Sequence, residues 1–184
     1  MKLTRGPLLA SLLAVSLAAG AVPLKTDPAR STITATFKQM NVPVEARFRN
    51  FSAQLDYDAA RPEAARASVD IDTASLDLGD PDMNREVAKK DWFNSAQFPK
   101  ASFVSEAIKP AGPGKLSVTG KLTIKGKSAH VSFPLTVRQE AGKQLFEGAL
   151  PIRRLAYNIG DGEWKDTSMV ADEVVIRFRV LAGQ

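Results

Sequence analysis

The sequence feature that most constrains the fold is a strict alternation of apolar and polar residues across positions 116–137 (LSVTGKLTIKGKSAHVSFPLTV). One phase of this pattern is apolar and consists of Leu116, Val118, Leu122, Ile124, Val131, Phe133, Leu135 and Val137. Side chains alternate between the two faces of a strand, so a period of two predicts a hairpin with one buried face and one wet face. Lys125, Gly126 and Lys127 separate the two halves, and Gly126 can adopt the positive φ that a tight turn requires.

The same alternation recurs along most of the chain. It appears over residues 32–37, 44–49, 53–58, 67–72, 101–108, 146–152 and 173–181. One segment differs, because Asp80 is suited to cap a helix and Pro81 suits its first position, so we predict one short helix within residues 80–93. About eight short antiparallel strands indicate an all-β sandwich or a closed barrel, and periodicity does not decide between them. It also does not decide between a side-chain-filled core and a hollow one.

The N-terminus predicts a secretory signal peptide over residues 1–21, which leaves a single domain over residues 22–184. Lys2 and Arg5 precede an apolar run over residues 8–19, and Ala19-Gly20-Ala21 is a small-x-small cleavage pattern. The run is shorter than the roughly 20 apolar residues of a membrane-spanning helix. The chain has no Cys, so the exported domain must rely on its core without disulfides, and thiol catalysis and thiolate metal sites are excluded.

The remaining composition argues against catalysis and nucleic-acid binding. Without Lys2 and Arg5, the 25 basic residues become 23 against 20 acidic ones, a net charge of +3 with no Lys/Arg block. The one histidine, His130, falls in the polar phase of its strand and is expected to be exposed. We predict no catalytic residue, no metal site and no cofactor. Residues 126–128 (GKS) lack the spacing of a phosphate-binding loop, and residues 160–166 lack that of a calcium loop; Trp164 is expected to fold over the end of the barrel.

Several landmarks, taken in order, resemble the YceI-like family, the periplasmic polyisoprenoid-binding proteins of bacteria. They stand at residues 69–76 (VDIDTASL), 90–94 (KDWFN), 97–99 (QFP), 120–126 (GKLTIKG), 152–154 (IRR) and 170–174 (VADEV). The resemblance spans about residues 27–182. The chain departs from the family's usual pattern at Ala46, where a Gly is common, and at Leu78-Gly79 and residues 84–87 and 154–158. These departures affect the expected mouth more than the expected barrel.

The resemblance implies an eight-stranded antiparallel lipocalin-like barrel with one short helix near its mouth. It further implies a periplasmic, non-catalytic carrier whose apolar tunnel holds an isoprenoid or quinone-type lipid, or a fatty-acid-like one. A prenyl tail needs only an apolar binding surface. Each Å² of the tail's apolar surface that the tunnel removes from water stabilises the complex by about 25 cal/mol. The ligand-binding residues that we predict are Phe37, Phe48, Leu55, Trp92, Phe93, Phe98, Phe103, Leu122, Phe133, Leu135, Phe146, Tyr157 and Trp164, with Arg85 and Arg154 for a head group.

Two other functions are compatible with the sequence. The Trp92 landmark and the loop Gly162-Glu163-Trp164 resemble a branch of the family associated with cytochrome b561-type proteins, so the chain could be an accessory subunit of such an inner-membrane redox partner. An enzyme acting on lipids or quinones is the third hypothesis, and its only support is His130. The resemblance and the exposed strand edges also suggest a homodimer.

Overall fold

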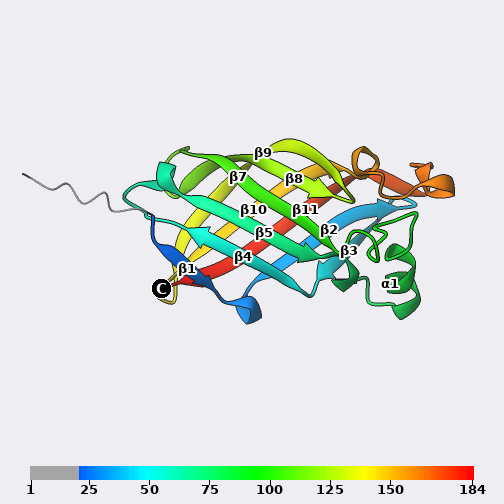
Figure 1. The fold of residues 1–184 in the computed structure, drawn as a ribbon, viewed down its shortest axis with the longest axis horizontal. Helices are drawn as coiled ribbons and strands as arrows, with labels where there is room; N and C mark the ends of the chain where they lie inside the picture. The colour runs from blue at the N-terminus through cyan, green and yellow to red at the C-terminus, as the bar shows by residue number, and fades with distance from the viewer. Residues whose placement is uncertain (1–20) are drawn as a thin grey trace, which may run out of the picture.

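Residues 21–184, the part of the chain that the computed structural model describes, form one antiparallel sheet that closes on itself (Figure 1). The predicted signal peptide lies outside these residues except for Ala21. The strands are β1 (Pro23–Thr26), β2 (Thr32–Gln39), β3 (Val42–Phe48), β4 (Phe51–Asp56), β5 (Arg66–Asp72), β6 (Leu76–Asp77), β7 (Lys100–Pro110), β8 (Lys115–Ile124), β9 (Lys127–Glu140), β10 (Lys143–Arg153) and β11 (Val170–Gly183).

The barrel closes where the first and last strands pair. Lys25 lies opposite Gly183 and Thr26 opposite Ala182, and the other edge of β1 pairs with β4. The resulting ring has eight strands in the order β1, β4, β5, β7, β8, β9, β10 and β11. Closure leaves the eight-strand ring itself without a free edge. The prediction of an eight-stranded antiparallel barrel is confirmed, and the sandwich is excluded.

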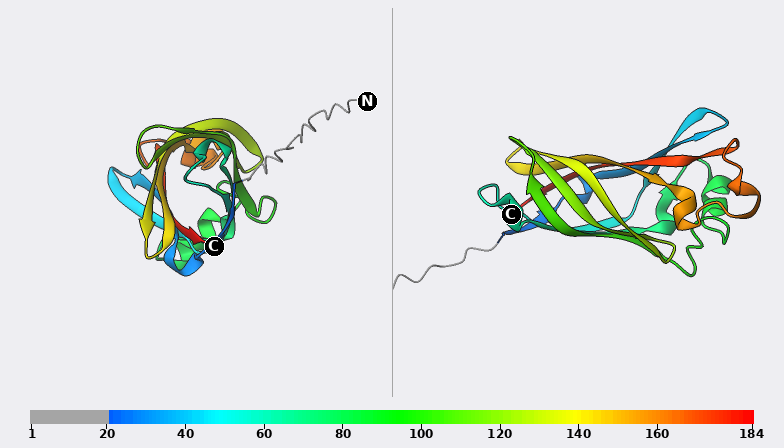
Figure 2. Two further views of the ribbon diagram at one scale, coloured as in Figure 1. Left: turned by 90° about the vertical axis from the view of Figure 1, so that its left-hand side faces the viewer. Right: turned by 90° about the horizontal axis from the view of Figure 1, so that it is seen from above.

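A hairpin of β2 and β3 continues one wall of the barrel beyond the ring. After a 3₁₀ turn at Pro28–Arg30, β2 pairs with β11 next to β1. At its outer edge β3 meets β6 only at Arg47 and Phe48, which lie opposite Asp77 and Leu76. Figure 2 shows this hairpin reaching outward at the end of the barrel that also carries the helix α1. We call this end the mouth.

The helix α1 (Pro81–Val87) caps one side of the mouth. Asp80 accepts hydrogen bonds from the backbone N–H groups of Asp82 and Met83, as the predicted N-cap requires. The helix ends at Val87, because the N–H of Phe93 folds back to the Val87 carbonyl and Phe93 lies in a series of turns. Trp92 lies beyond the helix and is carried by the turn to the interior of the barrel, where it lines an apolar cavity.

The opening pattern of the sequence forms the hairpin of β8 and β9. Its turn has Lys125 at φ 48° and Gly126 at φ 74°, the left-handed pair of a two-residue hairpin turn. Leu116, Val118, Leu122 and Ile124 are all buried. The apolar phase faces the barrel interior, as predicted, and the polar phase faces solvent.

Candidate functional site

An apolar cavity of about 360 Å³ occupies the mouth end of the barrel interior. We call it the mouth chamber. Its polar side chains are Gln39, Glu86, Ser102 and Arg154. Its apolar lining consists of Ala35, Phe37, Phe48, Val69, Ile71, Leu76, Leu78, Met83, Val87, Trp92, Phe93, Ala101, Phe103, Leu122, Ile124, Ile152, Ile159, Trp164, Val170, Val174 and Ile176. Such a lining favours a ligand with a long hydrocarbon part over one held by directional polar contacts.

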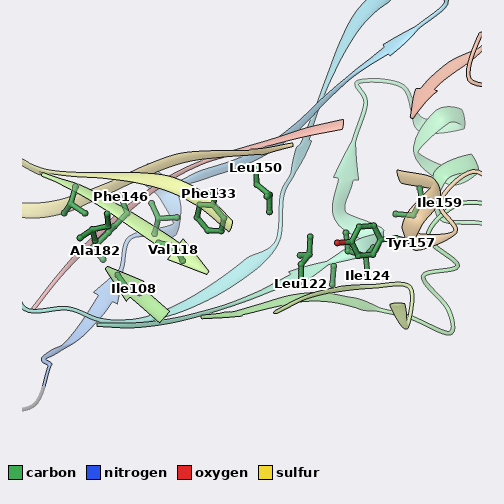
Figure 3. Close-up of a cluster of buried hydrophobic side chains, with 14 of the residues drawn as sticks. Ile108, Val118, Leu122, Ile124, Phe133, Phe146, Leu150, Tyr157, Ile159 and Ala182 are labelled. Atoms are coloured by element: carbon green, nitrogen blue, oxygen red, sulfur yellow. The ribbon is translucent and has the colours of Figure 1, made fainter. Parts of the chain in front are cut away.

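A second apolar cavity of about 120 Å³, the deep chamber, lies further along the same interior. Its lining includes Leu55, Tyr57, Phe133, Leu135, Phe146 and Phe178. Val69, Ile71, Phe103, Leu122 and Ile176 line both chambers, so the two cavities are adjacent compartments of one tunnel. Figure 3 shows interior side chains in two groups along the barrel, with Leu122 and Ile124 in one group and Phe133 and Phe146 in the other.

Three phenylalanine rings narrow the tunnel at the boundary of its chambers. The ring centroids of Phe103 and Phe133 are 5.4 Å apart, and those of Phe133 and Phe178 are 5.5 Å apart. The rings come from β7, β9 and β11, and β7 lies four places from β11 in the eight-strand ring, on the opposite wall. We call this row the aromatic constriction. It narrows the tunnel where the mouth chamber meets the deep chamber.

Two glycines make room for the outer rings of the constriction. A Cβ at Gly148 would lie 2.4 Å from Cζ of Phe178. One at Gly120 would lie 2.3 Å from the carbonyl oxygen of Val104 and 2.6 Å from Cζ of Phe103. The rings occupy the space that side chains would fill on β10 and β8, so they lie close to the wall instead of across the lumen. Gly120 shares the apolar phase of its strand, which places this gap on the inner face.

Two tryptophans and one arginine are packed together at the mouth. The rings of Trp92 and Trp164 are 5.3 Å apart, and the guanidinium carbon of Arg154 lies 5.7 Å from the centroid of the Trp92 ring. Trp164 belongs to the 3₁₀ helix Gly162–Lys165, which packs over the chamber as the sequence predicted. These are the two tryptophans of the chain, and both line the mouth chamber.

Arg154 orders the loops that surround this cluster. Its side chain is 2% exposed, and each of its three nitrogen atoms donates to backbone carbonyls. The acceptors are the carbonyl oxygens of Ala171 (3.1 Å), Ile159 (2.8 Å), Gly160 (3.3 Å), Trp164 (2.6 Å) and Val170 (2.7 Å). Burial lowers the pKa of the guanidinium, and nearby Asp172 opposes this change. Five carbonyl partners match the five N–H groups of an arginine, so Arg154 joins three chain segments into the rim of the mouth.

Asp77 fixes the base of α1 to the barrel. Its carboxylate accepts hydrogen bonds from Asn84 Nδ2 and the Gly79 N–H, both at 3.0 Å, and it pairs with Arg49. These three contacts, in that order of importance, lower the pKa of Asp77 from 3.8 to about 2. The side of the mouth formed by α1 is therefore held by a carboxylate that is ionised at neutral pH.

The structure brings most of the predicted ligand residues to the two chambers. Phe37, Phe48, Trp92, Phe93, Phe103, Leu122, Trp164 and Arg154 line the mouth chamber, and Leu55, Phe133, Leu135 and Phe146 line the deep chamber. Three predicted residues are in neither lining. Phe98 packs against Gly126, Tyr157 is buried in the same hydrophobic cluster as Ile124 and Ile159, and Arg85 pairs with Asp82 on the exposed face of α1.

Sequence reasoning missed several residues of the tunnel wall. Val69, Ile71 and Ile176 line both chambers, and Phe178 completes the aromatic constriction. Each belongs to the apolar phase of its strand, so the alternation could have identified them. The roles of Gly120 and Gly148 could not be found in this way, because a missing side chain gives no periodic signal.

The one histidine of the chain lies outside the tunnel. His130 is exposed, as predicted, and its Nδ1 is 2.9 Å from Glu106 on the outer wall. Across residues 21–184 there is no group of three His, Cys, Asp or Glu residues that could hold a metal ion. Within the same range, no helix is long and apolar enough to cross a membrane.

Comparison with known proteins supports the geometry of the barrel. The model of the YceI-like domain matches residues 24–182. A UPF0312 protein of Shewanella sp. (strain W3-18-1) is 33% identical over 141 residues, which cover 73% of this chain and 72% of the relative. The crystal structure of BcnA from Burkholderia cenocepacia has a TM-score of 0.83 and 54% identity, and it covers 85% of this chain and 99% of that one.

A more distant structure shares the fold. A polyisoprenoid binding domain from Saccharophagus degradans, implicated in plant cell wall breakdown, has a TM-score of 0.70 at 16% identity. The match covers 89% of this chain and 98% of that domain. At this identity the similarity establishes a common architecture.

Proposed function

Since the chain belongs to the YceI-like family, we propose that it is a periplasmic carrier of isoprenoid or quinone-type lipids, without catalytic activity. The observation that carries this proposal is the two-chamber tunnel, whose wall is almost entirely apolar. The relative from Saccharophagus degradans, described as a polyisoprenoid binding domain, supports the ligand class. The predicted signal peptide supports the location.

The chemistry of the tunnel matches this type of cargo. Each buried methylene group of a prenyl tail contributes about 0.8 kcal/mol, and no polar partner is needed along the tail. Contact residues for the tail are the aromatic and aliphatic side chains of both chambers. A polar head group would remain at the mouth, where Gln39, Glu86 and Ser102 are the polar side chains besides Arg154.

The size of the chambers indicates how a long tail is accommodated. A water molecule occupies about 30 Å³ and a methylene group is of similar size, so the mouth chamber holds ~12 carbons of a chain. A longer tail must pass the aromatic constriction to reach the deep chamber.

The decisive experiment is lipid analysis of the purified protein. Protein isolated from the periplasm is extracted with organic solvent, and the extract is examined by mass spectrometry beside that of Phe133→Asp, which places a charge in the tunnel. Wild-type protein is expected to yield a stoichiometric prenyl lipid and the variant none. A folded wild-type protein that carries no lipid and takes up no polyprenyl quinone from detergent would overturn the proposal.

The alternative, an accessory subunit of a cytochrome b561-type membrane protein, is separable by experiment. Trp164, which motivated it, is engaged with Trp92 in the chamber wall. Retention of membrane-bound partners on the immobilised protein, lost in Trp164→Ala while the lipid content is preserved, would favour the alternative over the carrier function.

A further inference from the structure

The largest exposed apolar side chains are concentrated at the mouth. Besides Met1 the chain has three methionines, and all of them are exposed: Met40 by 64%, Met169 by 44% and Met83 by 38%. Val42 is 62% exposed. Among the described residues, only Val22 and Val104 are other large hydrophobic side chains of this exposure class. Methionine is flexible and polarizable, and it is used where an apolar surface must adapt to an irregular partner.

These side chains form one projecting edge. Met40 and Asn41 make the turn between β2 and β3, and the Met40 N–H donates to the Met169 carbonyl at 2.8 Å. Val42 lies opposite Gln39 in the hairpin. We call Met40, Val42 and Met169 the apolar tip. Figure 2 shows that the hairpin carrying it extends beyond the barrel wall.

The backbone of the turn at the tip is left-handed. Met40 has φ 47° and Asn41 has φ 65°. Both positions of such a turn favour Asn, Asp or Gly, and a methionine in the left-handed region is disfavoured. Lys125 and Ala141 have the same φ of 48° in their own turns, so the backbone angle alone does not set Met40 apart. What distinguishes this turn is that its left-handed residue is a methionine exposed by 64%.

The tip is continuous with the tunnel. Met83 lines the mouth chamber, and so do Gln39 and Val170, the chain neighbours of Met40 and Met169. Paired residues of an antiparallel sheet project to the same face, so Val42 faces the same side as Gln39. The inner wall of the tunnel therefore extends along the hairpin and ends at the apolar tip.

We propose that the apolar tip inserts into the surface of a lipid bilayer and aligns the tunnel mouth with it for exchange of the cargo. The inference rests on the proposed function for the identity of that cargo. A stable protein partner requires about 800 Å² of contact surface on each side, which three side chains on a narrow hairpin do not supply. Shallow insertion of a few apolar side chains is, in contrast, a common mode of reversible membrane attachment.

The charge around the tip indicates which lipids it accepts. Within five residues of the tip along the chain there are charges of both signs in similar number, the basic Lys38, Arg47 and Lys165 and the acidic Glu45, Asp166, Asp172 and Glu173. The attachment therefore depends on apolar burial, and it should differ little between neutral and anionic vesicles or between low and high salt.

Vesicle flotation tests the proposal, with phosphatidylcholine vesicles and vesicles that also contain phosphatidylglycerol. The test variant is Met40→Asn with Val42→Ser, in which Asn suits the left-handed turn, so that the fold should be retained. The matched control is Val104→Ser, which removes a valine of 48% exposure from the outer wall of β7. Burial of one apolar side chain is equivalent to roughly a tenfold change in partitioning or more, so the double variant should bind vesicles at least tenfold more weakly.

A second readout separates the tip from the tunnel. The double variant should take up a polyprenyl quinone from vesicles at least tenfold more slowly, while its equilibrium affinity for the quinone in detergent stays within twofold of wild type. Equal flotation of wild type and double variant would overturn the proposal, and so would an equal loss in Val104→Ser. Binding to native membranes but not to protein-free vesicles would also overturn it in favour of a protein partner. Normal flotation without quinone uptake would instead refute the carrier function and leave the tip intact.

Discussion

Replacement of Gly148 by alanine tests whether the aromatic constriction determines the length of the bound tail. The new Cβ would lie 2.4 Å from Cζ of Phe178 and 3.0 Å from the Pro134 carbonyl oxygen. The ring is the part that can move, and it must move off the wall toward Phe133, whose centroid is 5.5 Å away. Gly148→Ala should therefore close the passage between the chambers.

The structure determines how much Gly148→Ala should lower the stability of the protein and its affinity for a long tail. Overpacking costs about 1–3 kcal/mol, and loss of the flexible glycine from the unfolded chain offsets about 0.4–1 kcal/mol of this. The melting temperature should fall by about 2–6 °C for a domain of this size. The deep chamber of about 120 Å³ holds ~4 methylene groups, so its closure should cost a long tail about 3 kcal/mol, or roughly a hundredfold in Kd.

Fluorescence titration measures these affinities directly, because Trp92 and Trp164 both line the mouth chamber. A quinone with a two-isoprene tail and one with an eight-isoprene tail are compared in wild type and Gly148→Ala. We expect the short ligand to bind both proteins within threefold, and only the long ligand to lose affinity. Combining Gly148→Ala with Phe178→Leu should restore the affinity for the long ligand, because leucine is smaller than the ring that the new Cβ displaces.

The control substitution is Gly183→Ala on β11, where the new Cβ would meet the flexible side chain of Lys143 at 2.9 Å. This variant should bind both ligands as wild type does. If folded Gly148→Ala binds the long tail with unchanged affinity, or loses both ligands equally, the constriction does not act as a length-selecting element.

Variants at four further positions test other parts of the structure. Arg154→Met removes a buried cation from its five carbonyl partners and should lower the free energy of unfolding by about 3–5 kcal/mol in urea titrations. Arg154→Lys should recover little of this stability, because an ammonium group cannot reproduce the planar arrangement of five donors in a guanidinium group. Phe133→Asp should leave no measurable quinone binding in the fluorescence assay, whereas retention of binding would place the ring outside the ligand path. The pKa of Asp77 is about 2 in the folded protein, below the value near 4 of an unfolded chain. The carboxylate therefore stabilises the fold fully above pH 4, and this stabilisation is lost as the pH falls through 2. The urea midpoint should thus drop between pH 4 and pH 2 more steeply in wild type than in Asp77→Asn. Arg85→Ala, on the exposed face of α1, should change stability and ligand affinity little, and a large loss of affinity would restore Arg85 as a head-group contact.

The local elements were largely predictable from the sequence. Alternation at residues 116–137 determined which side chains of β8 and β9 face inward, since a strand has a period of two and a one-residue shift would expose the whole apolar phase. Asp80 and Pro81 determined where α1 begins. The end of α1 at Val87 was harder to predict, because it depends on a backbone hydrogen bond from the Phe93 N–H back to the Val87 carbonyl.

Much of the candidate site was predictable as well, but not its organisation. Arg154 was predicted as a head-group contact, and its sequence position gave no sign of the carbonyl groups that surround it. Those carbonyls come from residues up to 17 positions away, and they converge only after the mouth loops have folded.

The sequence by itself determined strands with one apolar face and a chain suited to a family of barrels. Only the tertiary structure decided that these strands close through β1 and β11, from opposite ends of the chain, and that a tunnel remains inside. Alternation describes neighbours along one strand, whereas closure and hollowness depend on contacts between strands. Gly120 and Gly148 express this difference, because their missing side chains make room for Phe103 and Phe178 across the sheet.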